Sequence, residues 1–215
     1  MKTIKQKFVL DESGSMEDQQ QTVISGFNEQ LSTMQQEEKV GALQKDGTRI
    51  SIRYLVTLIK FNDKVTVLYK DKPLSEVPKL TTETYAPTGW TALYDAIGTA
   101  IDTAALGETD NIVTVFTDGQ ENRSKKWNKT TTKTLIDIRQ RENKWAFVYF
   151  GANVDAFYEA ASIGISNAVN YTAANTGAAI SAMDCVRSCY VTTATSGEYN
   201  VSNLTSTVNT NDLVK

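Results

Sequence analysis

Short side chains that carry oxygen occur at three places in the sequence, each where a strand ends or a helix begins. The residues concerned are Asp11, Ser13, Ser15, Thr91 and Asp118. The first three follow the apolar run 8–10, and the last follows the hydrophobic run 111–116. Two carboxylates and three hydroxyls are hard oxygen donors, which Mg²⁺ and similar divalent cations prefer. The sequence therefore indicates a cation site, provided that the fold brings the three places together.

Taken singly, each of these residues has a simpler structural interpretation. Ser13 or Ser15 would cap the helix that follows them, and Thr91 would cap a later helix. Asp118 and Gly119 form a common turn pair. The combination favours the cation site, because the three segments are far apart in the sequence and are nevertheless expected to meet in space.

The composition is that of an ordinary globular protein. The chain has 215 residues, enough for one domain with a substantial core, and 40% of them are hydrophobic and 22% charged. Its formal net charge of −3 gives no electrostatic basis for binding nucleic acid or an acidic membrane. The first residues lack the apolar stretch of a signal peptide, and no stretch approaches a membrane span. We therefore expect a cytoplasmic protein whose partner is neither nucleic acid nor membrane.

The lack of histidine and the small number of cysteines exclude several kinds of catalytic and metal site. Histidine is absent, which removes the usual general base, the commonest zinc ligand and the Ser-His type of triad. Cys185 and Cys189 are too few, without histidine, for a structural zinc site. Because they lie four apart in an expected helix, we expect two small apolar groups buried on one helical face.

Hydrophobic periodicity alternates between strand and helix along almost the whole chain. The expected strands cover residues 5–10, 49–61, 64–69, 111–116, 144–150 and 168–171. The expected helices cover residues 15–38, 91–105, 127–143, 154–161 and 175–193. The second and third strands are joined by a short polar turn and should pair antiparallel as a hairpin. Residues 41–47 are expected to form a loop.

This alternation predicts an α/β fold, doubly wound, with a mostly parallel sheet and helices on both faces. Residues 1–195 are expected to form one domain, and the polar segment 196–215 a loosely held tail. In such sheets, sites form at the carboxyl ends of the strands. Asp11 and Asp118 each close a strand and Thr91 opens a helix at the same edge, so the three places should meet there.

The chemistry of the ion suggests what such a site would do. Mg²⁺ binds about six oxygens and gives up its waters reluctantly, so it usually keeps waters or takes ligands from a partner. Two carboxylates balance its charge, whereas hydroxyls are weak neutral donors. If the carboxylates act through water, the ion stays electrophilic, and an open position would favour an incoming carboxylate or phosphate.

Three segments carry a resemblance to a known family. Residues 11–16, 87–97 and 116–122 read Asp-Glu-Ser-Gly-Ser-Met, Pro-Thr-Gly-Trp-Thr-Ala-Leu-Tyr-Asp-Ala-Ile and Phe-Thr-Asp-Gly-Gln-Glu-Asn. In order and spacing they resemble the three parts of the metal-ion-dependent adhesion site of von Willebrand factor type A domains, and the resemblance extends over residues 5–164. It implies a six-stranded sheet with one antiparallel edge strand. It also implies Mg²⁺ as the usual ion, with Mn²⁺ or Ca²⁺ as alternatives.

The resemblance assigns roles by position. The metal residues would be Asp11, Ser13, Ser15, Thr91 and Asp118. In the family the serines commonly bind the ion directly, while the aspartates often act through water and the threonine alternates between the two. Trp90 departs from the smaller residue that usually precedes the threonine, and it would narrow the rim or provide a contact surface. Residues 150–155 and the Ala-rich helix after them resemble bacterial and phage cytoplasmic members.

The leading functional hypothesis is a binding module without enzymatic activity. The cation would accept an acidic side chain of a protein partner as its missing ligand, and the loops around it would contact the rest of that partner. The expected contact residues of this rim are Glu12, Gly89, Trp90, Gln120 and Glu121. The two glutamates would either repel acidic ligands or hold the loops, and the sequence leaves both possibilities open.

Two other classes of function remain as alternatives. The first is a Mg²⁺-dependent phosphoryl-transfer or hydrolytic enzyme, since such enzymes also place an aspartate at the end of the first strand of an α/β sheet. Against it, Ser13 stands where such enzymes have a second acid, and no histidine is available as a base. The second is a structural component of a phage particle or another large assembly, with a vestigial metal site.

Overall fold

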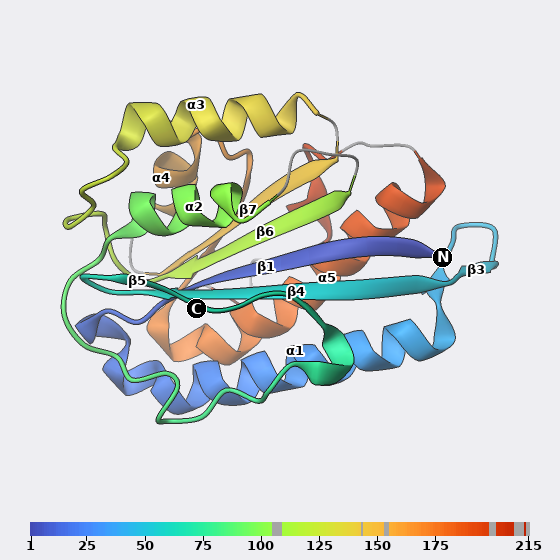
Figure 1. The fold of residues 1–215 in the computed structure, drawn as a ribbon, viewed down its shortest axis with the longest axis horizontal. Coiled ribbons are helices and arrows are strands. Elements are labelled where there is room, and N and C mark those ends of the chain that lie inside the picture. Colours follow the sequence, from blue (N-terminus) through green and yellow to red (C-terminus); the bar gives the residue numbers. More distant parts are fainter. Residues whose placement is uncertain (105–108, 143, 153–154, 198–200, 209–212, 214–215) are drawn as a thin grey trace.

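A six-stranded sheet between two layers of helices forms the protein (Figure 1). The computed structural model describes residues 1–104, 109–142, 144–152, 155–197, 201–208 and 213. The strands are β1 (Lys2–Asp11), β2 (Ala42–Leu43), β3 (Arg49–Ile50), β4 (Ile52–Phe61), β5 (Val65–Pro73), β6 (Asp110–Thr117), β7 (Trp145–Ala152) and β8 (Asn167–Tyr171). The α-helices are α1 (Gln20–Val40), α2 (Leu93–Asp102), α3 (Lys129–Gln140), α4 (Ala156–Ser162) and α5 (Thr176–Ser196). The 3₁₀ turns are η1 (Gly14–Gln19), η2 (Leu74–Glu76), η3 (Ala173–Asn175) and η4 (Leu204–Thr207).

The large sheet has the strand order β5-β4-β1-β6-β7-β8. All neighbours pair in parallel except β4 and β5, which form an antiparallel hairpin at one edge. This confirms the expected α/β fold with six strands and a single antiparallel edge strand. The central strands β6 and β7 are buried along their whole length, as their nearly continuous apolar sequences predict. The carboxyl ends of the parallel strands lie at the left of Figure 1.

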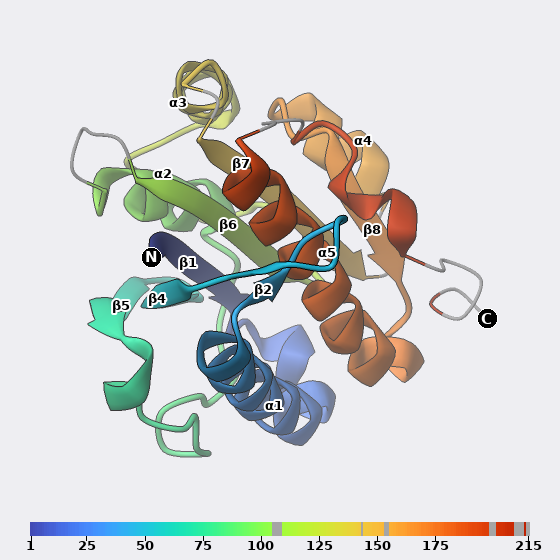
Figure 2. The ribbon, with the colours of Figure 1, turned by 90° about the vertical axis from the view of Figure 1, so that its right-hand side faces the viewer.

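Helices cover both faces of the sheet and create two separate cores. On one face α1 and α5 pack against each other and against the sheet, and on the other face lie α2, α3 and α4 (Figure 2). Alternate residues of β1 divide between the two cores: Phe8 and Leu10 belong to the first, and Val9 to the second. No helix among the described residues has the length and apolar character needed to cross a bilayer.

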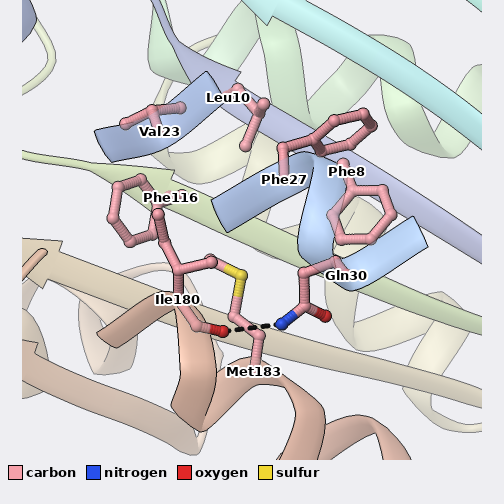
Figure 3. Close-up of a pocket in the computed structure, with 8 residues that line it drawn as sticks. All are labelled: Phe8, Leu10, Val23, Phe27, Gln30, Phe116, Ile180 and Met183. Atoms are coloured by element: carbon pink, nitrogen blue, oxygen red, sulfur yellow. Dashed lines mark hydrogen bonds between the residues drawn. The ribbon is translucent and has the colours of Figure 1, made fainter. Parts of the chain in front are cut away.

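A small cavity lies inside the first core, between the sheet, α1 and α5 (Figure 3). Its volume of about 10 Å³ leaves room for roughly one water molecule and no larger ligand. The residues that line it are Phe8, Leu10, Val23, Phe27, Gln30, Phe116, Ile180 and Met183. Gln30 Nε2 donates to the carbonyl oxygen of Ile180 at 2.7 Å and so ties α1 to α5. This face of the sheet therefore serves packing.

Four details differ from the sequence predictions. Residues 41–47, predicted to be a loop, contribute β2 to a short antiparallel pair with β3. The predicted helix 15–38 begins instead as the 3₁₀ turn η1, because its first residues are held by contacts to other loops. Cys185 is exposed and Cys189 is only partly buried against the first core, so the predicted burial of both is wrong. The fourth difference concerns β8, the strand at the opposite edge of the sheet from β5. It contacts a segment of the polar C-terminal region.

That C-terminal segment is held more firmly than its polar composition predicts. Leu204 is fully buried, and its amide N–H donates to Asn167 Oδ1 at 2.8 Å. The Asn167 side chain also donates to the carbonyl oxygen of Val201 at 2.6 Å. Leu213 is buried as well. Asn167 of β8 thus fixes the segment at Val201 and Leu204, while the amide of Thr172 donates to the carbonyl oxygen of Leu213 at 3.0 Å.

The antiparallel edge strand is irregular. Its pairing with β4 shifts register near Leu58, and Asp71 adopts a positive φ of 45°. Lys5 Nζ lies 2.8 Å from Asp71 Oδ2, so an ion pair holds this bulge against β1. The strand carries exposed Lys70 and ends at Pro73, which has no N–H to donate.

Close packing between α2 and the loop before α3 requires a glycine. A Cβ atom at Gly98 would lie 2.4 Å from the nearest ring atom of Trp127, far inside van der Waals contact. In contrast, a Cβ atom at Gly177 in α5 would lie 3.7 Å from its nearest neighbour, Thr22 Cγ2.

We expect Gly98→Ala to lower the free energy of unfolding by about 1–3 kcal/mol, because the rigid ring of Trp127 must move. The matched control Gly177→Ala should be neutral or stabilising by up to about 1 kcal/mol, since alanine favours the helix and meets no clash. Urea unfolding of both variants and the parent protein measures the difference. Equal stability of the two variants would contradict the close packing of α2.

Candidate metal centre

The parallel pairing of β1 with β6 brings the two key carboxylates to one edge of the sheet. Leu10 pairs with Phe116, so Asp11 lies at the level of Thr117 and Asp118 follows directly. The loop after Asp11 leads into η1 and the loop before α2 carries Thr91, both at the same edge (Figure 1). The topology thus places the three predicted segments together, as expected for strands whose carboxyl ends point one way.

Asp11 is completely buried and fully hydrogen-bonded. Its Oδ1 accepts from the amide N–H of Ser13 at 2.8 Å, and its Oδ2 accepts from the hydroxyl of Thr117 at 2.5 Å. Its backbone carbonyl accepts from the Tyr85 hydroxyl at 2.5 Å. Burial raises the pKa of the Asp11 carboxyl to about 6, although the bonds from Thr117 and Ser13 act in the opposite direction. The nearby Asp118 carboxylate raises that pKa slightly further.

Asp118 joins the two serines of the first loop. Ser15 donates its hydroxyl to Asp118 Oδ1 at 2.6 Å, and the hydroxyls of Ser13 and Ser15 lie 3.1 Å apart. The other oxygen, Oδ2, accepts from Gln19 Nε2 at 3.2 Å. Burial raises the pKa of the Asp118 carboxyl, and the bonds from Ser15 and Gln19 only partly offset this. Neither serine caps a helix, since no side-chain bond to the amides of η1 forms.

Thr91 completes the set from the third segment. It is buried, its amide N–H donates to Asn122 Oδ1 at 2.9 Å, and its carbonyl accepts from the Asn122 amide at 3.0 Å. A Cβ atom at Gly119 would lie 3.0 Å from Thr91 Oγ1 and 3.7 Å from Asp11 Oδ2. The hydroxyl of Thr91 and the carboxylate of Asp11 therefore face the same small space. Thr91 does not cap α2, whose N-cap residue is Ala92.

The spacing of these oxygens fits a small divalent cation. Neighbouring ligands in an octahedral Mg²⁺ site lie about 2.9 Å apart, as follows from ion–oxygen distances of about 2.0–2.1 Å. The oxygens of Ser13, Ser15 and Asp118 are separated by 3.1 Å and 2.6 Å. Among the described residues, no group of three or more acidic, histidine or cysteine side chains surrounds a common point. A cation here would thus depend on hydroxyls for more than half of its protein ligands.

The loop that precedes Thr91 approaches the first loop closely. The carbonyl oxygen of Gly89 accepts from the amide of Gly14 at 3.1 Å, and Gly89 has φ of +78°. A Cβ atom at Gly89 would also lie 2.3 Å from Asp63 Oδ2. Glycine is therefore required at position 89 both for its conformation and for space.

The expected rim residues fall into two groups. Gly89, Trp90 and Gln120 are exposed beside the site, and Trp90 is 60% exposed. Glu12 is not on the rim surface, because it is 5% exposed and its Oε1 accepts from Lys60 Nζ at 2.7 Å and from the Ala86 amide at 2.6 Å.

Glu121 is also used within the protein. Its carboxylate accepts from the amides of Tyr94, Arg123 and Ser124 and from the Ser124 hydroxyl, at 2.6–2.9 Å. Of the two possibilities that the sequence leaves open for Glu12 and Glu121, the contacts support holding the loops.

Sequence reasoning missed several residues that orient the site. Thr117 holds Asp11, Gln19 holds Asp118, and Tyr85 holds the backbone of Asp11. The position of Gln19, four residues after Ser15, is a signal that it shares a helical face with that serine. The parallel register of the strands would have indicated Thr117. No pattern marks Tyr85, because it lies in an irregular connection.

Comparisons with known proteins agree with this geometry. A family model of the von Willebrand factor type A domain matches residues 7–206. The fold is similar to that of proximal thread matrix protein 1 from the mussel byssus with a zinc-occupied MIDAS motif, at 16% identity and a TM-score of 0.58, over 90% of this chain and 46% of that chain. No curated protein matches the sequence.

Two bacterial pilus proteins have a similar fold. One is the pilus adhesin SpaC from Lactobacillus rhamnosus GG, at 13% identity and a TM-score of 0.62, over 90% of this chain and 30% of that chain. The other is the vWF domain of the pilus tip protein Mfa5 from Porphyromonas gingivalis, at 11% identity and a TM-score of 0.55, over 90% of this chain and 95% of that chain. The chain spans less than half of the mussel protein and of SpaC. At these identities the likeness concerns the fold alone.

We expect the metal-stripped protein to lose stability as the pH rises from about 4 to about 6. Burial raises the pKa of Asp11 from 3.8 to about 6, so the folded state keeps a proton that the unfolded state releases. This stabilisation is fully present below the pKa that Asp11 has in the unfolded state, and it is lost as the pH rises through the pKa that Asp11 has in the folded state. It amounts to at most about 3 kcal/mol. Urea unfolding at several pH values measures it.

Asp11→Asn should remove the part of this pH dependence that Asp11 contributes, because the amide does not titrate, while Asp184, whose pKa burial also raises to about 6, keeps its own part. The exposed Asp18 provides the matched control Asp18→Asn, which should keep the slope of the parent protein. A parent protein and Asp11→Asn variant with parallel stability curves would show that Asp11 is not the group responsible.

Proposed function

We propose that this chain, which belongs to the von Willebrand factor type A domain family, binds a protein partner through a divalent cation. The convergence of two carboxylates and three hydroxyls from three segments is the observation that carries the proposal. When bound, Mg²⁺ supplies an electrophilic position that accepts an acidic side chain as its missing ligand. Mn²⁺ and Ca²⁺ share the preference for oxygen ligands and are the alternative ions.

The residues of the site have distinct roles in this proposal. Asp11 and Asp118 supply the negative charge, and the hydroxyls of Ser13, Ser15 and Thr91 supply neutral oxygens. Ser15 is exposed, whereas the other four residues are buried. A partner's carboxylate therefore approaches from the side of Ser15, beside the exposed Trp90. Thr117 and Gln19 fix the orientation of the two buried aspartates.

The surroundings of the site favour binding over hydrolysis. A hydrolytic reaction needs a group that takes a proton from water, and the chain has no histidine. The neighbouring carboxylates of Glu12 and Glu121 already accept hydrogen bonds from loop amides, and Glu12 is also paired with Lys60. Among the described residues, neither is free to act as a general base. One protein of similar fold, SpaC, is a pilus adhesin, and adhesion is the class of activity proposed here.

The first test is direct binding of the metal. Calorimetric titration with Mg²⁺ or Mn²⁺ should show one site in the parent protein, and Asp11→Ala or Asp118→Ala should weaken it by at least about 10- to 100-fold, the loss typical even for residues that only support metal ligands. Saturating metal at 100 times its Kd should add about 2.7 kcal/mol of stability. Asp18→Asn is the charge-matched control. Unchanged affinity in both site variants would refute this location.

The second test concerns the partner. Immobilised protein should retain a protein from lysate of its own source in Mg²⁺ and release it in excess EDTA, because the chelator removes the ion that accepts the carboxylate. Asp11→Ala should retain nothing in either buffer, while Asp18→Asn should behave as the parent. A partner that stays bound in excess EDTA would contradict the cation-dependent mechanism.

A further inference from the structure

A strongly basic segment lies directly after the candidate metal centre. Residues 122–133 contain five cations and no acidic residue, although the whole chain has a net charge of −3. These cations form what we call the basic ridge: Arg123, Lys125, Lys126, Lys129 and Lys133. All five are exposed. The ridge joins Asp118 at the end of β6 to the first turn of α3, and its course along α2 is visible at the left of Figure 1.

The backbone of the ridge is fixed by α2. The carboxylate of Asp95 accepts from the amides of Lys125, Lys126 and Trp127, each at 2.9 Å. The ring of Trp127 packs on Gly98 of the same helix. Lys125 and Lys126 therefore project from a loop whose backbone is already ordered, and Lys129 and Lys133 project from α3, so less conformational entropy is lost when a ligand binds.

The ridge also begins at the candidate metal centre itself. Asn122 makes two hydrogen bonds with the backbone of Thr91. Asp95 lies in the first turn of α2, four residues after Thr91, and its carboxylate holds the backbone at Lys125 beside that turn. On the other side, Arg123 Nε lies 3.2 Å from Asp63 Oδ1, next to Gly89. At least the first half of the ridge is therefore within the reach of a ligand that touches the ion.

Two of the ridge lysines have no carboxylate partner. Within the part of the chain that the structure describes, no ion pair is formed by Lys125 or Lys129. Lys129 Nζ instead lies 5.6 Å from the ring centroid of Tyr158, which is 65% exposed. The ion pairs of the other three cations are exposed, and such pairs contribute only about 0–1 kcal/mol each. Lys125 and Lys129 therefore present positive charge that no ion pair within the described residues neutralises.

We propose that the basic ridge is a second contact for the partner, and that it selects an acidic peptide segment. This inference rests on the proposed function. One carboxylate of the segment would reach the ion, and further acidic side chains about two or three residues away would lie over Lys125 and Lys129, since an extended chain spans about 3.4 Å per residue. A site that takes a single carboxylate thus becomes selective for several carboxylates in one segment.

The arrangement favours a peptide over a nucleic acid. The cations are confined to a short loop and the beginning of α3, and the remainder of the chain carries enough acidic residues to give a negative total. A nucleic acid extending beyond the ridge would meet that negative charge, whereas a short acidic segment would not. The exposed ring of Trp90, next to Thr91 in the sequence, provides apolar contact for the rest of a peptide.

The test compares two fluorescein-labelled peptides by anisotropy in Mg²⁺. One peptide, Gly-Ser-Glu-Ser-Gly-Ser-Gly, carries a single acidic side chain, and the other, Gly-Ser-Glu-Ser-Glu-Glu-Gly, carries three. The second should bind about three- to tenfold more tightly at low salt, as expected for two exposed charge pairs, and the advantage should shrink at high salt. The double variant Lys125→Gln/Lys129→Gln should lose this advantage and keep the affinity for the first peptide.

The control variant Lys39→Gln/Lys45→Gln removes the same charge from exposed lysines at the opposite end of the sheet and should bind both peptides as the parent does. An equal loss in the control, or no loss in the ridge variant, would overturn the role of the ridge. Binding of oligothymidylate that persists in EDTA and is lost in the ridge variant would assign the ridge to nucleic acid instead.

The two proposals fail in different ways. If the single-acid peptide binds only with Mg²⁺ and the three-acid peptide binds no more tightly, the proposed function stands and the ridge inference fails. If Mg²⁺ and Asp11→Ala affect neither peptide, carboxylate binding through the ion fails, and the ridge inference fails with it.

Discussion

Two buried carboxylates at the ends of adjacent parallel strands impose the main constraint on this protein. Asp11 and Asp118 lie where both burial and mutual repulsion favour the protonated form. Their negative charge must therefore be stabilised by donors from elsewhere in the chain. The hydroxyls of Thr117 and Ser15 and the amide of Gln19 do this in the absence of an ion. The turn after β1 takes its shape from these bonds, since Ser15 and Gln19 must both reach Asp118.

The other acidic and amide side chains near the site act as scaffolding for its loops. Glu12 holds the loop at Ala86, Glu121 holds the start of α2, and Asp95 holds the segment that follows Glu121. Glu12 accepts one such amide hydrogen bond and Glu121 and Asp95 accept three each, all from amides that the irregular backbone would otherwise leave unsatisfied. The rim is therefore rigid before any partner arrives, and its outward-facing chemistry is left to Trp90, Gln120 and the lysines of the basic ridge.

The general outline of the fold and the members of the candidate site could be predicted from sequence, because both depend on local patterns. Hydrophobic periodicity predicts every strand of the large sheet. The two carboxylates are predicted from their positions directly after the strands that correspond to β1 and β6. The remaining features depend on distant contacts. Glu12 is buried because Lys60 pairs with its carboxylate, and Leu204 is held because its amide donates to Asn167. The backbone of Asp11 is held by the hydroxyl of Tyr85. Hydrophobic periodicity does not reveal which distant residues form pairs. Each of the polar residues involved, considered alone, has the character of a surface residue.

The irregular edge strand β5 affects self-association of the protein. An unpaired strand edge is a template on which a second chain adds a strand. Here the bulge at Asp71, the charge of Lys70 and the ring of Pro73 interrupt that template along β5. Growth of the sheet from one molecule into the next is thereby discouraged. At this edge of the sheet, the backbone of β5 is thus a poor surface for pairing with another chain.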